Sequence, residues 1–211
     1  HCLQDQQLRD IEATGRPVVL VLMAGRATTV NYAARHVPAI INACFPGEYG
    51  GQAVAEVIFG AYNPGGRLTC TTPRTVGQIP YAFPFKPGSD VKNKSSLWGC
   101  LFPFGHGLSY TRFEYSDLVI SRSTMLPTDS VTVTAKVKNV GSREGDEVVQ
   151  LYVRDEVSTV TTYTQVLRGF ERISLKPGES QMVTFRLGPA DLALWDNDMR
   201  FVVEPGDYTL M

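Results

Sequence analysis

The sequence has no long hydrophobic run and no excess of charge of either sign. Its longest apolar stretch, from Val18 to Ala24, is far shorter than the roughly 20 residues that a membrane-spanning helix requires. The formal net charge is −1, and the Lys and Arg residues are scattered along the chain. A protein that follows the phosphate backbone of nucleic acid gathers its basic residues in a stripe. We therefore expect neither a membrane nor a nucleic acid as a partner.

Cysteine is also scarce. The four cysteines, Cys2, Cys44, Cys70 and Cys100, match no zinc-ligand or redox spacing and are too few for a disulfide framework. Cys44 and Cys70 lie in apolar, strand-like runs, so we expect both to be buried free thiols that act as small hydrophobic groups. His36 and His106 have no metal-binding side chain at ligand spacing. The sequence predicts no metal site and no cofactor.

The first third of the chain alternates between helix and strand. Its predicted elements are, in order, helix 3–11, strand 18–23, helix 30–35, strand 37–45, helix 51–59 and strand 67–72. We expect Gly60 to end the helix 51–59 in the left-handed cap conformation, and Gly51 to lie where the backbone closely approaches the neighbouring strand. Such alternation predicts a parallel, doubly wound α/β layer. A parallel sheet must be covered on both faces, and three strands with two or three helices are too few for such a layer to stand alone. We therefore expect residues 1–72 to be the carboxyl-terminal part of an α/β sandwich domain whose earlier strands lie upstream of His1.

The pattern changes near Phe113. From Val131 to Val137, apolar residues alternate with Thr and Lys, which is the period of a half-buried strand. Further short strands are expected at 148–154, 163–172, 181–187, 200–203 and 207–211. Six or seven strands at this spacing predict a β-sandwich over residues 113–211, immunoglobulin-like or fibronectin type III-like. The Pro- and Gly-rich residues 73–112 are predicted to be a crossover loop and linker. The expected fold class is thus multi-domain, α/β plus all-β.

Five motifs in series resemble the carboxyl-terminal part of glycoside hydrolase family 3 enzymes, of the β-glucosidase and β-xylosidase type. They are ATGRPVVLVLMAGR (13–26), PGEYGGQAVAEVIFGAYNPGGRL (46–68), LFPFGHGLSYTRFEYSDL (101–118), VKNVGSREGDEVVQLYVRD (137–155) and LRGFERISLKPGES (167–180). Each motif alone is modest, but together they are spread along nearly the whole chain and follow the family's order. The resemblance implies the end of the α/β sandwich domain followed by a fibronectin type III-like domain.

The resemblance also implies an activity and a place for it. Family members are retaining exo-acting glycosidases, O-glycoside hydrolases that release terminal β-D-glucosyl or β-D-xylosyl residues with two carboxyl groups about 5 Å apart. In the family, the aspartate nucleophile lies on an amino-terminal barrel, and the glutamate acid/base lies upstream of the helix at which this chain begins. We therefore assign no catalytic residue here and expect this fragment alone to be inactive. The implied partners are the amino-terminal barrel domain and an oligosaccharide or aryl β-glycoside substrate, and the implied location is secreted or periplasmic.

Several acidic or glycine-rich positions could suggest chemistry of their own. Glu48 precedes the helix 51–59, where stabilisation of the helix start is a simpler role than catalysis. Neighbouring carboxylates occur at 146–147 and 155–156, and we expect both pairs to lie on a solvated strand edge. The turn Asn63–Arg67 lacks the Lys-Ser/Thr partner of a phosphate-binding loop and precedes a strand, so we reject that interpretation.

Aromatic residues are concentrated in the loop 73–112. Tyr81, Phe83, Phe85 and Trp98 could stack on sugar rings, and Tyr81 and Trp98 are the candidate binding residues. Packing of the long loop is the interpretation that we favour. The alternative function is a non-catalytic module that binds carbohydrate or a protein, which calls for an exposed planar row of aromatics that the Val/Thr alternation does not provide. A nucleotide-binding protein is a third class, but no Gly-x-Gly-x-x-Gly opens a helix.

Overall fold

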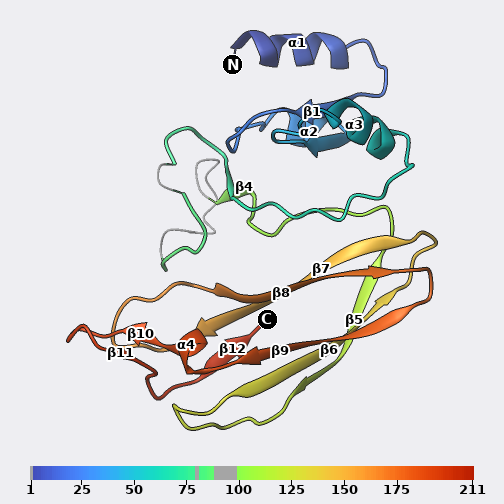
Figure 1. The fold of residues 1–211 in the computed structure, drawn as a ribbon. Coiled ribbons are helices and arrows are strands. Elements are labelled where there is room, and N and C mark those ends of the chain that lie inside the picture. Colours follow the sequence, from blue (N-terminus) through green and yellow to red (C-terminus); the bar gives the residue numbers. More distant parts are fainter. Residues whose placement is uncertain (1, 79–80, 88–98) are drawn as a thin grey trace. The chain divides into compact units, whose positions relative to one another are not determined.

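The computed structural model describes residues 2–78, 81–87 and 99–211 (Figure 1). The chain divides into two compact units whose segments alternate along the sequence. The first, which we call the α/β unit, holds the described residues of 1–62, 68–81 and 92–106. The second, the sandwich unit, holds those of 63–67, 82–91 and 107–211. The domain boundaries expected from the sequence, 1–72, 73–112 and 113–211, remain a prediction.

The α/β unit confirms the predicted alternation of helix and strand. Its elements are α1 (Cys2–Glu12), β1 (Val19–Leu22), α2 (Ala33–His36), β2 (Ala39–Asn42), α3 (Gly50–Ile58), β3 (Thr72–Pro73) and β4 (Cys100–Phe102). Strands β1 and β2 pair in parallel, with Val19 opposite Ala39. No helix in the described part of the chain is long and apolar enough to cross a bilayer.

The predicted third strand of the parallel sheet, 67–72, is wrong. The N–H of Leu68 donates to the carbonyl of His106, and the carbonyl of Leu68 accepts from the N–H of Gly105, both at 2.8 Å. Thr72 then lies opposite Phe102 in the antiparallel pair β3–β4. This segment therefore runs beside the returning chain rather than beside β1 or β2. Extended backbone was predictable here, but its partner strand lies about 30 positions further along the chain.

The structure corrects the expected burial of the cysteines and confirms one glycine prediction. Cys44 and Cys70 are exposed rather than buried, because Cys44 follows β2 in a bend and Cys70 lies in the bend before β3. Gly60 follows α3 with φ +76°, the left-handed cap that we expected. Close backbone approach, in contrast, does not fall at Gly51: a Cβ there would meet no described atom within 4 Å, whereas one at Gly50 would lie 2.5 Å from Cγ of Pro46.

The sandwich unit confirms the predicted β-sandwich. Its elements are β5 (Phe113–Ile120), β6 (Val131–Asn139), β7 (Gly145–Asp155), β8 (Val166–Leu175), β9 (Ser180–Leu187), α4 (Pro189–Leu192), β10 (Leu194–Trp195), β11 (Phe201–Val202) and β12 (Tyr208–Leu210). Two three-stranded antiparallel sheets, β5-β6-β9 and β12-β7-β8, form its layers. The sequence pattern did not predict β5, α4 or β10 as separate elements.

The core between these sheets follows the predicted period of two. Val133 and Val137 on β6 are 2% and 0% exposed, so the apolar side of the Val/Thr alternation faces inward. Two clusters form this core, one around Leu151 and Leu187 and one around Leu175, and the half-buried Phe185 packs against both. The residues that alternate with them stay closer to solvent.

Candidate functional site

The turn Asn63–Arg67 packs on strand β7 within the sandwich unit. Nη2 of Arg67 lies 2.8 Å from Oε1 of Glu147, and the two side chains are only 12% and 10% exposed. Oδ1 of Asn63 accepts from the hydroxyl of Ser109 at 3.0 Å and from the N–H of Tyr110 at 2.7 Å. A Cβ added to Gly65 would lie 2.6 Å from Cβ of Asp146, so only glycine fits there. We call Asn63, Gly65, Arg67 and Glu147 the turn anchor.

The turn anchor is a structural arrangement rather than a reactive one. Arg67 is already paired with Glu147 and also donates to the carbonyls of Gly65 and Gly66, both at 3.2 Å. Tyr115 lies on β5, and its partial burial, together with the nearby charge of Glu147, raises the pKa of its hydroxyl well above the ordinary value. A charge-assisted hydrogen bond between poorly exposed groups holds backbone in place, because separating it would leave a charge unpaired.

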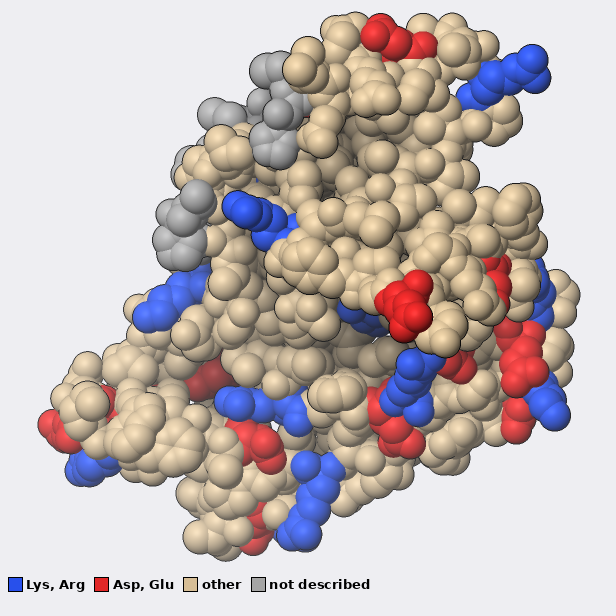
Figure 2. Space-filling view, turned by 45° about the horizontal axis from the view of Figure 1, so that its top comes forward, with Lys and Arg blue, Asp and Glu red and all other residues tan. Residues whose placement is uncertain are grey.

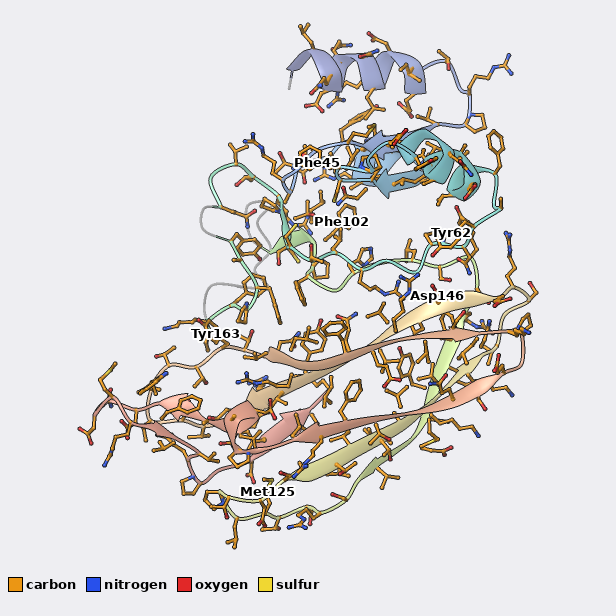
Figure 3. The ribbon with its side chains drawn as sticks, viewed as in Figure 1. Phe45, Tyr62, Phe102, Met125, Asp146 and Tyr163 are labelled. Atoms are coloured by element: carbon orange, nitrogen blue, oxygen red, sulfur yellow. The ribbon has the colours of Figure 1, made fainter. Side chains whose placement is uncertain are left out.

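The prediction of a solvated edge at 146–147 is wrong for Glu147. Glu147 is buried, at 8% exposure, because the turn 63–67 covers it. Asp146 lies on the same strand (Figure 3), is itself half-buried and pairs with Arg172. Burial pushes the pKa of Asp146 upward, but hydrogen bonds from Arg172 and Ser174 outweigh it and hold the pKa below its ordinary value. Neither carboxylate is free to act as a nucleophile or an acid.

The second pair of neighbouring carboxylates, Asp155 and Glu156, lies at the end of β7, and its two members differ in exposure. Glu156 is exposed and accepts from the hydroxyl of Thr209 at 2.5 Å. Asp155 is half-buried, and burial, with the charges of Glu204 and Glu156 nearby, raises its pKa. The solvated-edge prediction therefore fits Glu156 only. Across the described residues, no three His, Cys, Asp or Glu side chains are grouped so that they could hold a metal ion.

The other single residues of interest lie in ordinary structural places. Glu48 is exposed in the turn just before α3. His36 stacks on Tyr32, with ring centroids 4.3 Å apart, and His106 stacks on Phe102 at 5.4 Å. On the face shown in Figure 2, basic and acidic side chains are interspersed. Nothing about these positions points to catalysis.

The aromatic loop residues fall into two groups. Phe83 contacts Phe85 and Tyr152 edge to face, with centroids 6.1 and 5.7 Å apart, so it packs against β7. The carbonyl of Phe85 accepts from the N–H of Thr164 at 2.7 Å, which ties the same segment to the sandwich unit. Tyr81 is half-buried in the α/β unit, and Trp98 lies outside the described residues. A sugar-binding role for Tyr81 and Trp98 stays a prediction.

Comparison with known proteins gives a consistent result over the whole chain. The family model for the glycosyl hydrolase family 3 C-terminal domain matches residues 2–110, and the model for the fibronectin type III-like domain matches residues 147–211. A β-xylosidase of Formosa agariphila is 42% identical over 99% of this chain, and a periplasmic β-glucosidase of Salmonella typhimurium is 40% identical over 95%.

The structural comparison agrees. A solved β-glucosidase structure from Erythrobacter marinus superposes with a TM-score of 0.90 at 40% identity and covers 99% of this chain. That match takes in 28% of the Erythrobacter chain, and the two sequence relatives are covered over 29% and 28% of their length. The chain thus spans less than a third of the length of the relatives that it matches.

Proposed function

Because this chain belongs to glycoside hydrolase family 3, we propose that it is the carboxyl-terminal part of a retaining exo-β-glycosidase that hydrolyses terminal β-D-glucosyl or β-D-xylosyl residues. The observation that carries the proposal is the identity of 40% or more, over nearly the whole chain, with both a β-xylosidase and a β-glucosidase. Each of those proteins continues far beyond the matched part, so the activity belongs to the longer protein.

In this proposal the nucleophile and the acid/base lie upstream of residue 1. Retaining hydrolysis requires one ionised carboxylate facing the anomeric carbon and one protonated carboxyl facing the leaving oxygen. Within the described residues, two of the enclosed carboxylates already have cationic partners: Glu147 binds Arg67 and Asp146 binds Arg172. The role of this part is to form the end of the α/β domain and a sandwich attached to it. Its substrate is an oligosaccharide or an aryl β-glycoside bound by the longer protein.

The experiment that tests the proposal compares two proteins on nitrophenyl β-glucoside and nitrophenyl β-xyloside. The 211-residue chain alone should release no nitrophenol above background, whereas the longer protein that contains it should turn over at least one of the two substrates. Activity of the 211-residue chain that survives purification, and that is lost when one of its own carboxylates is replaced, would contradict the proposal. A longer protein that is inactive on both would favour a non-catalytic binding module instead.

The location proposed for the longer protein is secreted or periplasmic. A relative at 40% identity carries the name periplasmic β-glucosidase, which supports this location. Cell fractionation of the native host, followed with an antibody against the 211-residue chain, tests it. Recovery of the protein with a cytoplasmic marker enzyme, and not in the periplasm or medium, would contradict it.

A further inference from the structure

Two large aromatic rings lie side by side on the hairpin formed by β10 and β11, which projects at one end of the sandwich (Figure 1). Trp195 and Phe201 are directly opposite each other in the antiparallel register, so both side chains point to the same face. Their ring centroids are 5.3 Å apart, and the ring planes are inclined by 43°. Trp195 is 58% exposed and Phe201 is 50% exposed.

Hydrogen bonds to one carboxylate hold the tip of this hairpin in shape. The side chain of Asp196 accepts from the N–H of Asp198 and from the N–H and Nε of Arg200, each at 2.9 Å. The backbone N–H of Arg200, followed by its side chain, keeps the pKa of Asp196 below its ordinary value. Nη2 of Arg200 also binds Asp198 at 2.8 Å. The turn that joins the two ring-bearing strands is therefore held in shape before any ligand arrives, which reduces the entropy lost on binding.

The size of the exposed apolar surface limits what can cover it. About half of each ring is exposed, which amounts to on the order of 200 Å² for the pair. A stable protein interface needs about 800 Å² from each partner, so the pair by itself falls well short of one. One or two sugar rings, in contrast, match a surface of this extent.

We propose that Trp195 and Phe201 form a non-catalytic binding site for a chain of β-linked pyranose sugars. The C–H faces of a β-glucosyl or β-xylosyl residue are apolar, while its equatorial hydroxyls point outward toward acceptors. This assignment of ligand rests on the proposed glycosidase function.

The test is a titration of the 211-residue chain with xylohexaose and with cellohexaose, followed by calorimetry. We expect binding of both saccharides, because both backbones present apolar C–H faces to the rings. Trp195→Ala and Phe201→Ala should each weaken binding by about tenfold or more. Phe170→Ala is the matched control, since Phe170 lies on β8 of the same unit and is 69% exposed. It should leave binding unchanged, and all variants should keep the melting temperature of the parent chain.

Three outcomes overturn the proposal: no binding of either saccharide by the folded chain, equal loss of binding in Phe170→Ala, and self-association that depends on Trp195 without any binding of sugar. Sedimentation of the parent and of Trp195→Ala detects the last. The measurement is independent of hydrolysis. An inactive longer protein with Trp195-dependent binding would contradict the proposed function alone, whereas an active one without such binding would contradict this inference alone.

Discussion

The two units of this chain use their apolar side chains in different ways. Among the described residues, every buried hydrophobic side chain except Ala33 and Val37 lies in the sandwich unit. The α/β unit instead exposes large apolar groups, with Phe45 at 82% and Phe59 at 86%. A two-stranded parallel sheet cannot cover its own faces, whereas two facing antiparallel sheets cover each other. The sandwich therefore supplies its own core, whereas the α/β unit leaves large apolar side chains uncovered.

The largest expected effect is a difference in protease resistance between the units. Under limited digestion of the 211-residue chain, we expect early cleavage in the α/β unit and a surviving carboxyl-terminal piece of about 11 kDa, because cleavage follows local opening. Gel electrophoresis with mass spectrometry identifies the products. Equal survival of residues 1–62 would break the comparison.

The next effect concerns the turn anchor, which makes the sandwich depend on residues far upstream of its strands. Arg67→Met should lower the free energy of unfolding by about 3–5 kcal/mol, because it leaves Glu147 poorly exposed and unpaired. The double variant Arg67→Met/Glu147→Met should recover much of this loss. Urea unfolding of the parent, both single variants and the double variant measures the coupling. If the two losses simply add, the ion pair is not what holds the turn.

A core substitution tests the self-sufficiency of the sandwich. Leu175 is fully buried, so Leu175→Ala should cost about 2–5 kcal/mol in the free energy of unfolding. Leu118→Ala on β5 is the control, since Leu118 is 63% exposed and its truncation should cost within about 0.5 kcal/mol. Chemical denaturation monitored by circular dichroism gives both values. Similar losses in the two variants would contradict the assignment of the core.

The smallest expected effect lies in the α/β unit. Gly60 has φ +76° at the end of α3, and a β-branched side chain there should cost about 1–2 kcal/mol. In the longer protein, Gly60→Val should lower the melting temperature and leave kcat and KM of the folded enzyme nearly unchanged. Loss of turnover with an unchanged melting temperature would place α3 in the active site, against the supporting role proposed for it.

Local patterns in the sequence predicted the parts of the fold that depend on neighbouring residues. The alternation Val131–Val137 predicted the inward face of β6, because side chains of a strand point to alternate sides. A glycine after an apolar helical run predicted the left-handed cap at Gly60. The series of short strands predicted the sandwich, and the five motifs predicted the family that the comparisons show.

Which distant segments meet could not be read from local pattern and is seen only in the folded chain. The residues around Glu147 do not indicate that Arg67, 80 positions away, pairs with it. The sequence pattern therefore predicted a solvated carboxylate where the structure has an enclosed one. Segment 67–72 reads as a strand, but its pairing with 100–106 depends on the path of the returning chain. Likewise, the short hairpin places Trp195 opposite Phe201, and its strands are too short for a hydrophobic period to predict this pairing. Local pattern was enough for most helices and strands and for the inward face of β6, because these follow from local backbone geometry. Ion pairs, exposed thiols and the aromatic pair follow from contacts between segments, which only folding brings together.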